Sequence, residues 1–238
     1  GGIKVHTLIR GEEGVPYDIH FSSAATHDHV LLRKLKLTDG AFVAMDRAYI
    51  DYRVFEQMSS QGVFYVTKMK KNQRYKVANS CHYVNENGLV VFKDQGITFS
   101  KDEIVHQSRR IEYWEECKEN PIVLLTNNFD LDTEEIIEIY KYRWRIELLF
   151  KQLKQNFPLK YFYGDSVNAI KIQIWVALIA NLLITIVKKR VKRPWSFSNL
   201  VTIIRQTLMY YINVYAFCEN PEKAWLSKIK QREKSLFS

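Results

Sequence analysis

Four polar side chains recur at spacings of three, four and seven residues within one segment of the sequence. They are Tyr140, Arg143, Glu147 and Lys154. On a helix these steps return to the same face, so the four side chains would form one polar stripe. Glu147 is the single carboxylate of that stripe, and carboxylate oxygens are the ligands that hard divalent cations prefer. The pattern indicates one carboxylate held in a basic cleft.

An ordinary surface pair is the alternative explanation for this stripe. Arg143 and Glu147 are four residues apart, and such pairs on exposed helices stabilise a protein by only about 0.3–0.5 kcal/mol. Apolar residues border the stripe on both sides, among them Ile139 on one side and Trp144 on the other. A stripe with apolar borders is not typical of a fully solvated face.

The element that positions this stripe is predicted to be one long helix over residues 133–157. Thr133 can cap its start, and Glu134 and Glu135 fall in the first turn, where the helix dipole favours negative charge. Pro158 ends it, because proline has no backbone N–H and restricts the residue before it.

A second carboxylate, Asp46, follows a short apolar run at residues 41–45. Such a run is typical of a buried central strand. The carboxyl end of a buried strand lies at the rim of a sheet, where the sites of α/β proteins usually form. The alternative is that Asp46 only caps the helix that follows, and the sequence leaves both roles open.

The two motifs resemble those of insertion-sequence transposases of the DDE family. The family signature around its last acidic residue has the form Y-x2-R-x3-E-x6-K, which residues 140–154 match. The family's second acidic motif is a strand that ends in Asp, followed by Arg and Tyr, as in Asp46, Arg47 and Tyr49. Ala48 stands where many members of the family have glycine.

The resemblance implies a role for each of these residues. Asp46 and Glu147 would be catalytic residues and ligands of a two-metal site that holds Mg²⁺ or Mn²⁺ and carries out in-line phosphoryl transfer on DNA. Tyr140, Arg143 and Lys154 would bind DNA phosphates close to the metals. Lys151 points the same way along the helix and would assist.

The resemblance also implies an α/β fold, with a ribonuclease H-like mixed sheet, helices, a β-rich insertion and C-terminal helices. Alternation and apolar runs predict core strands at residues 2–10, 15–22, 41–45 and 63–68, with helices at 27–37 and 49–61. In the β-rich insertion, residues 77–123, strands are expected at 89–92, 97–99, 108–114 and 122–126. Helices are expected after Asp165 or Ser166 up to Arg190, over 197–217 and over 223–234.

We expect residues 1–238 to form one ribonuclease H-like domain from which the first strand is missing. In the family the first catalytic aspartate lies on that strand, and this sequence starts at the second. Asp18 and Asp28 are the only early alternatives, and neither falls at the family position. The chain starts with Gly1 rather than methionine, so we expect a C-terminal fragment of a longer transposase or a decayed copy.

Charge and composition point to a polyanionic partner and a reducing compartment. The net charge is +9, and the residues from Tyr140 onward carry 18 Lys and Arg against 5 Asp and Glu. Such a basic half favours a polyanion, with nucleic acid first, although a generally basic protein is the alternative. The resemblance implies that the partner is double-stranded DNA, namely transposon ends and target. The three cysteines show no metal-binding spacing. The apolar run at residues 174–187 is short for a membrane span and predicts a buried helix, so no membrane partner is expected. The resemblance implies the bacterial cytoplasm, in association with the nucleoid.

Three functions remain open from the sequence. The first is a DNA transposase that cleaves DNA and transfers strands with the help of metal ions, acting as a homodimer in a synaptic complex. The second is a DNA-binding fragment of the same fold without catalysis, and the third is a metal-dependent nuclease of similar fold. An upstream strand that ends in Asp would decide in favour of catalysis.

Overall fold

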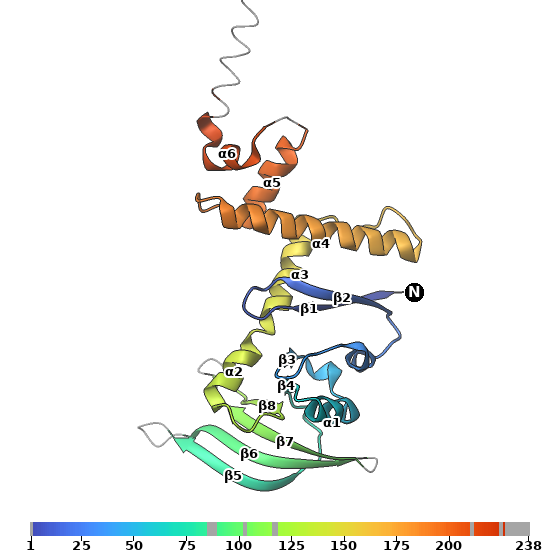
Figure 1. Ribbon diagram of the computed structural model, residues 1–238, viewed down its shortest axis with the longest axis vertical. Helices are drawn as coiled ribbons and strands as arrows, with labels where there is room; N and C mark the ends of the chain where they lie inside the picture. The colour runs from blue at the N-terminus through green and yellow to red at the C-terminus, as the bar shows by residue number, and fades with distance from the viewer. Residues whose placement is uncertain are drawn as a thin grey trace, which may run out of the picture. The chain divides into compact units, whose positions relative to one another are not determined.

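The computed structural model describes residues 2–84, 90–101, 104–115, 119–209, 212–223 and 226. The chain divides into two compact units, residues 1–147 and residues 148–238. Each unit is described by itself below (Figure 1).

The first unit begins with a β-hairpin that forms a sheet of its own. β1 (Ile3–Ile9) pairs antiparallel with β2 (Pro16–Ser23), with His6 opposite His20. Gly14 has a φ of 65° in the connecting turn, a conformation that glycine adopts without strain. A two-stranded hairpin alone is marginally stable in water, so its packing against the rest of the unit matters.

The main sheet of the first unit has six strands in the order β3-β4-β8-β7-β6-β5. Their bounds are β3 (Phe42–Met45), β4 (Phe64–Lys68), β5 (Lys76–Val84), β6 (Val90–Lys101), β7 (Ile104–Tyr113) and β8 (Ile122–Thr126). β3 and β4 are parallel, and every other pair is antiparallel. The mixed α/β class predicted from the sequence is therefore confirmed.

Helical segments cover both faces of this sheet near β4. They are η1 (Asp28–Lys34), η2 (Arg47–Tyr49), α1 (Tyr52–Ser60) and α2 (Thr133–Lys141). α1 buries Phe55, which stacks on Tyr65 of β4 at 3.9 Å between ring centroids. On the other face of the sheet, Ile136 of α2 packs in a cluster with Val66 of β4 and Leu124 of β8. Tyr65 and Val66 are consecutive residues of β4, so their side chains point to opposite faces of the sheet. They accordingly belong to different core clusters.

Several predicted elements differ from the structure. β6 runs without interruption through residues 94–96, which lie between the strands predicted at 89–92 and 97–99; pairing with β5 and β7 on its two sides holds these residues extended. β5 has no predicted counterpart, because its polar and apolar residues are mixed on both sides of the strand and all of them are exposed. The segment predicted as a helix at residues 27–37 is the short 3-10 helix η1, which His27 precedes without a side-chain cap.

The predicted single helix over residues 133–157 is interrupted at Tyr142 and Arg143. α2 ends at Lys141, and α3 (Trp144–Asn156) begins three residues later. Between the two helices, backbone hydrogen bonds join residues three apart instead of four. Arg143 N–H donates to Tyr140 O at 3.1 Å, and Arg145 N–H donates to Tyr142 O at 3.0 Å. Asp132, not Thr133, caps α2, in a capping box with Glu135.

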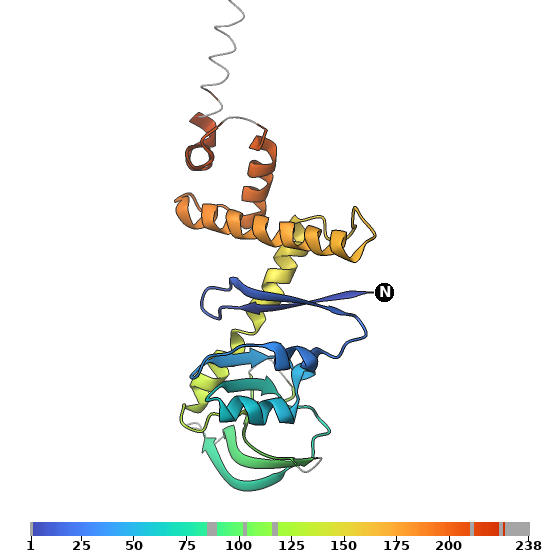
Figure 2. The same cartoon turned by 45° about the vertical axis from the view of Figure 1, so that its right-hand side comes forward.

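The second unit contains most of α3 and the helices α4 (Val167–Arg190), α5 (Phe197–Thr207) and α6 (Val214–Glu219). Ile184 of α4 packs with Leu200 of α5 and Cys218 of α6 in one apolar cluster. α5 and α6 replace the single helix predicted over residues 197–217, and most of the tail helix predicted over residues 223–234 lies outside the described residues. Figure 2 shows these helices from a second direction.

α4 is the one helix, among the residues that the structure describes, that is long and apolar enough to cross a membrane by length and composition. Its start is capped by Ser166, whose side chain accepts a hydrogen bond from Ala169 N–H. Only one face is buried, through Ala177, Leu178 and Ile184, so the predicted buried helix is buried in part. The length of such a helix is weak evidence for a membrane span, because core helices of water-soluble domains pass the same test.

Candidate active site

Asp46 lies directly after β3, at the carboxyl end of a strand, as the sequence predicts. Its Oδ1 accepts a hydrogen bond from Ala48 N–H at 3.0 Å, which caps η2. The side chain is nevertheless 50% exposed, and Oδ2 points toward Arg143. The two roles left open by the sequence therefore occur together: one carboxylate oxygen caps the turn, and the other remains accessible.

Arg143 brings the two predicted carboxylates together. Its Nη1 lies 2.8 Å from Glu147 Oε1 and 3.9 Å from Asp46 Oδ2. The sum of these two distances is the upper limit for the separation of the two oxygens, so Asp46 and Glu147 face the same small volume. Carboxylates of a two-metal site must flank ions that lie about 4 Å apart, and this separation is compatible with that requirement.

The guanidinium of Arg143 is firmly cationic and partly shielded from water. Its side chain is only 17% exposed, and Nε is buried without a hydrogen-bond partner among the described residues. Burial lowers the pKa of Arg143, but the neighbouring Tyr140 and Glu147 outweigh burial and hold the pKa above its usual value. A shielded cation between two carboxylates offsets their mutual repulsion.

Tyr140 is a core residue in this structure. It is 6% exposed and packs with Ile136 and Ile137, while Arg143 lies over its ring at 5.6 Å from the centroid. Burial raises the pKa of Tyr140, so its hydroxyl stays protonated. That hydroxyl has no hydrogen-bond partner within the described residues. The predicted contact of Tyr140 with DNA stays a prediction, and the ring itself supports Arg143.

The remaining predicted basic residues, Lys151 and Lys154, lie on α3 in the second unit and are exposed. The two early aspartates do not join the site. Asp18 interacts with His20, and Asp28 forms an ion pair with Lys4 at 2.9 Å. Neither residue is therefore a substitute for a third carboxylate.

Sequence reasoning missed the clamp behind Asp46. His6 Nδ1 lies 2.8 Å from the Tyr49 hydroxyl, and His6 Nε2 lies 2.8 Å from Ser22 Oγ. Tyr49 in turn donates its backbone N–H to the Asp46 carbonyl at 3.0 Å. The clamp therefore joins the hairpin sheet to the turn that carries Asp46. Alternation placed His6 on the strand face of Lys4, with no signal for a partner 43 residues away.

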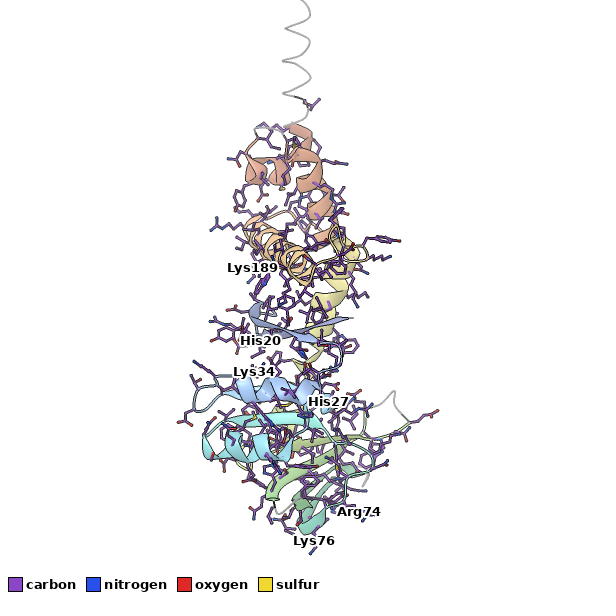
Figure 3. The ribbon with its side chains drawn as sticks, turned by 90° about the vertical axis from the view of Figure 1, so that its right-hand side faces the viewer. His20, His27, Lys34, Arg74, Lys76 and Lys189 are labelled. Atoms are coloured by element: carbon purple, nitrogen blue, oxygen red, sulfur yellow. The ribbon has the colours of Figure 1, made fainter. Side chains whose placement is uncertain are left out.

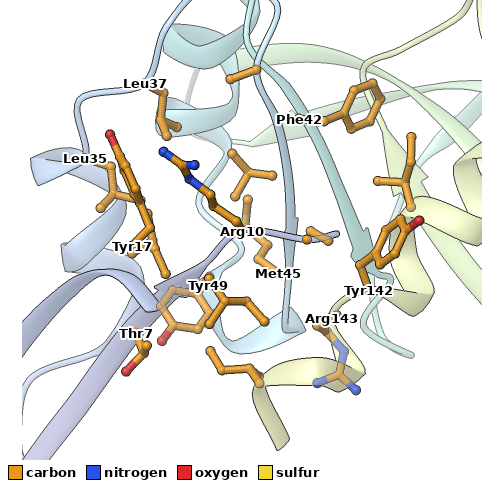
Figure 4. A pocket seen from close by; sticks show the side chains of 18 of the residues that line it. Thr7, Arg10, Tyr17, Leu35, Leu37, Phe42, Met45, Tyr49, Tyr142 and Arg143 are labelled. Carbon is orange, nitrogen blue, oxygen red and sulfur yellow. The ribbon is translucent and has the colours of Figure 1, made fainter. Parts of the chain in front are cut away.

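A groove of about 820 Å³ separates the hairpin from the main sheet. Among the described residues, β1 pairs only with β2 and β3 only with β4, so each of these two strands has an edge without a partner there. Figure 4 shows the side chains that line the groove. They include Thr7, Arg10 and Tyr17 of the hairpin, Phe42 and Met45 of β3, and Tyr142 and Arg143.

β1 and β3 run antiparallel on the two sides of this groove. His6 is bonded to Tyr49, beyond the carboxyl end of β3, whereas Arg10 lies toward Leu35 and Leu37, which precede β3 (Figure 4). A strand placed between the two edges and antiparallel to β1 would therefore run parallel to β3. Its carboxyl end would then lie on the side of Asp46.

The donor set fits a divalent cation only in part. Asp46 and Glu147 supply hard oxygen ligands and are 50% and 41% exposed. Among the residues that the structure describes, no three His, Cys, Asp or Glu side chains come close enough to hold a metal ion. One further carboxylate at this place would complete the set that a two-metal site requires.

Comparison with known proteins gives consistent matches. Residues 1–183 match the model of the transposase DDE domain. A Sinorhizobium fredii protein named as the transposase y4zB is 28% identical over 214 residues, which are 84% of this chain and 58% of the relative. The protein named as transposase for insertion sequence element IS5377 of Geobacillus stearothermophilus is 23% identical, over 86% of this chain and 55% of its own. A Synechocystis protein named as a transposase for insertion sequence element IS4SA is 26% identical, over 76% of this chain and 52% of the relative. The chain spans about half the length of the relatives it matches.

Proposed function

Because the chain belongs to the transposase DDE domain family, we propose that it is the larger part of a ribonuclease H-like catalytic domain that cuts and joins DNA at the ends of an insertion sequence. The family generally uses a divalent metal. In this proposal Asp46 and Glu147 are two of the three acidic ligands of a two-metal site for Mg²⁺ or Mn²⁺. The observation that carries the proposal is the placement of both carboxylates on one guanidinium, Arg143.

When bound, the metals supply an activated water or 3′-hydroxyl and stabilise the leaving oxygen in an in-line displacement. The residues of the chain do the positioning. The η2 turn and the clamp of His6 and Tyr49 hold Asp46 in place, so that only its outer oxygen is free to bind. Arg143 supplies a cation for a DNA phosphate, and the ring of Tyr140 packs against its guanidinium.

Lys151 and Lys154 are proposed as further contacts to DNA phosphates. Both are lysines on a helix, and lysine binds phosphate as a mobile point charge without reading bases. They would add affinity for double-stranded DNA that depends on salt and not on sequence.

We further propose that the third carboxylate comes from a strand that fills the groove between β1 and β3. The groove has an unpaired strand edge on each side, and main-chain hydrogen bonds to both edges would join the two sheets into one. An upstream segment of a longer protein that turns tightly before β1 would enter antiparallel to β1 and parallel to β3. An aspartate on this strand would lie beside Asp46. The corresponding domain proposal is one domain over residues 1–238, with its first strand missing and residues 77–123 as its β-rich insertion.

The proposed partners are the transposon ends and target DNA, bound by a homodimer in a synaptic complex, in the bacterial cytoplasm. A non-catalytic DNA-binding fragment is the second candidate, favoured because the described residues place only two carboxylates at the site. A hydrolytic nuclease of the same fold would use the same groups without the strand-transfer step.

The test compares this chain with a longer protein that also contains the upstream segment. The longer protein should nick a transposon-end duplex in Mn²⁺, and Glu147→Gln should abolish nicking while leaving most DNA binding intact. The present chain should bind DNA without nicking it.

Nicking by the present chain, lost on mutation of Asp18 or Asp28, would place the third ligand elsewhere. A longer protein that binds DNA but never nicks it in either metal would favour the non-catalytic candidate. Nicking without joining of the ends to target DNA would favour the nuclease.

A further inference from the structure

A second, shallower hollow of about 530 Å³ adjoins Asp46 on the side of the β4–β5 connection. It is lined by Asp46, Arg47, Ala48, Lys70, Lys71 and Asn72. Three of these residues are basic, and we call Arg47, Lys70 and Lys71 the basic shelf. All three have exposed side chains, and the family signature contains neither lysine.

The backbone that carries the two lysines is fixed from several sides. Met69 N–H donates to Val123 O at 2.9 Å, which anchors the start of the turn on β8. Gln73 then closes the turn: its Oε1 accepts from Lys70 N–H at 3.1 Å, and its Nε2 donates to the Tyr52 hydroxyl on α1. A ligand that binds here orders side chains but not the loop, so less conformational entropy is lost on binding.

The charges of the basic shelf are not neutralised within the described residues. No ion pair joins Arg47, Lys70 or Lys71 to an acidic side chain there, whereas Arg109 of the insertion pairs with Asp94 at 2.6 Å. The single carboxylate that lines the hollow, Asp46, also interacts with Arg143. Three positive charges that line one hollow, and form no ion pair with the described acidic side chains, exceed the single charge of Asp46 and favour a polyanion.

We propose that the basic shelf binds backbone phosphates of the DNA strand that passes Asp46. This inference rests on the proposed function and adds a phosphate-binding surface at a hollow that Asp46 lines and Arg143 does not. The hollow is open and lacks a buried polar pocket, so it suits a chain of phosphates along an extended backbone. Arg47 and the two lysines would hold neighbouring phosphates of that strand and thereby place the bond to be cut at the carboxylates.

The first measurement is the salt dependence of binding between this chain and a duplex, by fluorescence anisotropy. The double variant Lys70→Ala, Lys71→Ala loses two cations, so the slope of log affinity against log salt should become less steep by about 1.8, at about 0.9 per phosphate contact. Lys34→Ala is the matched control: Lys34 is an exposed lysine of the same unit, at the end of η1 (Figure 3). Its slope should stay within about 0.3 of that of the unmodified chain.

The second measurement determines how far DNA protects each lysine from acetylation. Acetylation of the free and DNA-bound chain, followed by mass spectrometry, should show Lys70 and Lys71 protected by DNA severalfold and Lys34 unprotected. Because no lysine is replaced, this result does not depend on the folding of a variant.

The possible results separate this inference from the function it rests on. DNA binding with an unchanged slope in the double variant, or with equal acetylation of Lys70, Lys71 and Lys34, would overturn the basic shelf and leave the proposed function in place. A chain that binds no duplex even at low salt would overturn the DNA partner, and with it both proposals.

Discussion

Replacing Arg143 with alanine should change the affinities for metal and for DNA in opposite directions. In the structure the guanidinium occupies the space between Asp46 and Glu147, where a divalent cation would bind, at 3.9 Å and 2.8 Å from their oxygens. A cation that enters must displace it. Arg143→Ala removes this competitor, so the two carboxylates should bind Mn²⁺ more tightly in the absence of DNA.

The size of the effect follows from the exposure of the two carboxylates. Both are close to half exposed, and ion pairs that are open to solvent typically contribute about 0–1 kcal/mol each. Only the Glu147 contact is within hydrogen-bond distance, so we take about 1 kcal/mol for the two together. At about 1.4 kcal/mol per tenfold, Mn²⁺ affinity should rise about fivefold.

DNA affinity should fall in the same variant. Loss of one phosphate contact would reduce the salt slope by about 0.9. Arg145→Ala is the matched control, because Arg145 is two residues further on, donates to the Glu12 carbonyl and lies over the Tyr142 ring, away from both carboxylates.

Titration calorimetry with Mn²⁺ and anisotropy with duplex DNA measure the two affinities. Arg145→Ala should change neither by more than about twofold, since surface contacts of this kind contribute little. A fall of Mn²⁺ affinity in Arg143→Ala would refute the competition argument, because it would mean that Arg143 orders the carboxylates for the metal. An unchanged salt slope would remove Arg143 from the DNA contacts.

Three further predictions concern stability. Burial holds the pKa of His106 below its usual 6.5, so the unfolded chain binds more protons than the folded chain just below that pH. The free energy of unfolding should therefore fall as pH drops from 6.5, by at most about 1.4 kcal/mol per pH unit from this group. In urea titrations over that pH range, His106→Asn should reduce the pH dependence of the free energy of unfolding. Phe55→Ala empties a fully buried site against Tyr65 and should reduce the free energy of unfolding by about 3–5 kcal/mol in urea titrations; a loss below about 1 kcal/mol would contradict the burial of Phe55. Ser166→Ala removes the cap of α4 and should cost about 1 kcal/mol, measured in the same way, whereas Ser166→Asp should restore it.

The sequence by itself determined the local parts of the site. Arg143 and Glu147 are four residues apart, and this spacing was sufficient to predict their contact, which forms although Arg143 lies in the turn between α2 and α3. The apolar run before Asp46 was sufficient to predict a strand that ends at that carboxylate. β8 also matched its predicted bounds, because its short run of apolar, mostly buried residues gives a clear signal.

Local patterns were insufficient where tertiary contacts decide the backbone. Helix propensity continues through Tyr142 and Arg143, yet Tyr142 lies against Gly11, and Arg145 bonds to the Glu12 carbonyl, both more than a hundred residues earlier in the chain. These contacts coincide with the interruption between α2 and α3. In β6, pairing on both edges outweighs the turn preference of residues 94–96.

Only the tertiary structure decided how the site is assembled. No period or spacing relates Asp46 to Arg143, which lie on different elements and meet because β3 and the end of α2 converge. The clamp between His6 and Tyr49, the groove with two unpaired strand edges and the basic shelf have the same origin. Each depends on which strands are neighbours in the sheets, and strand order is set by burial and hydrogen bonding across the whole unit, which a local pattern does not encode.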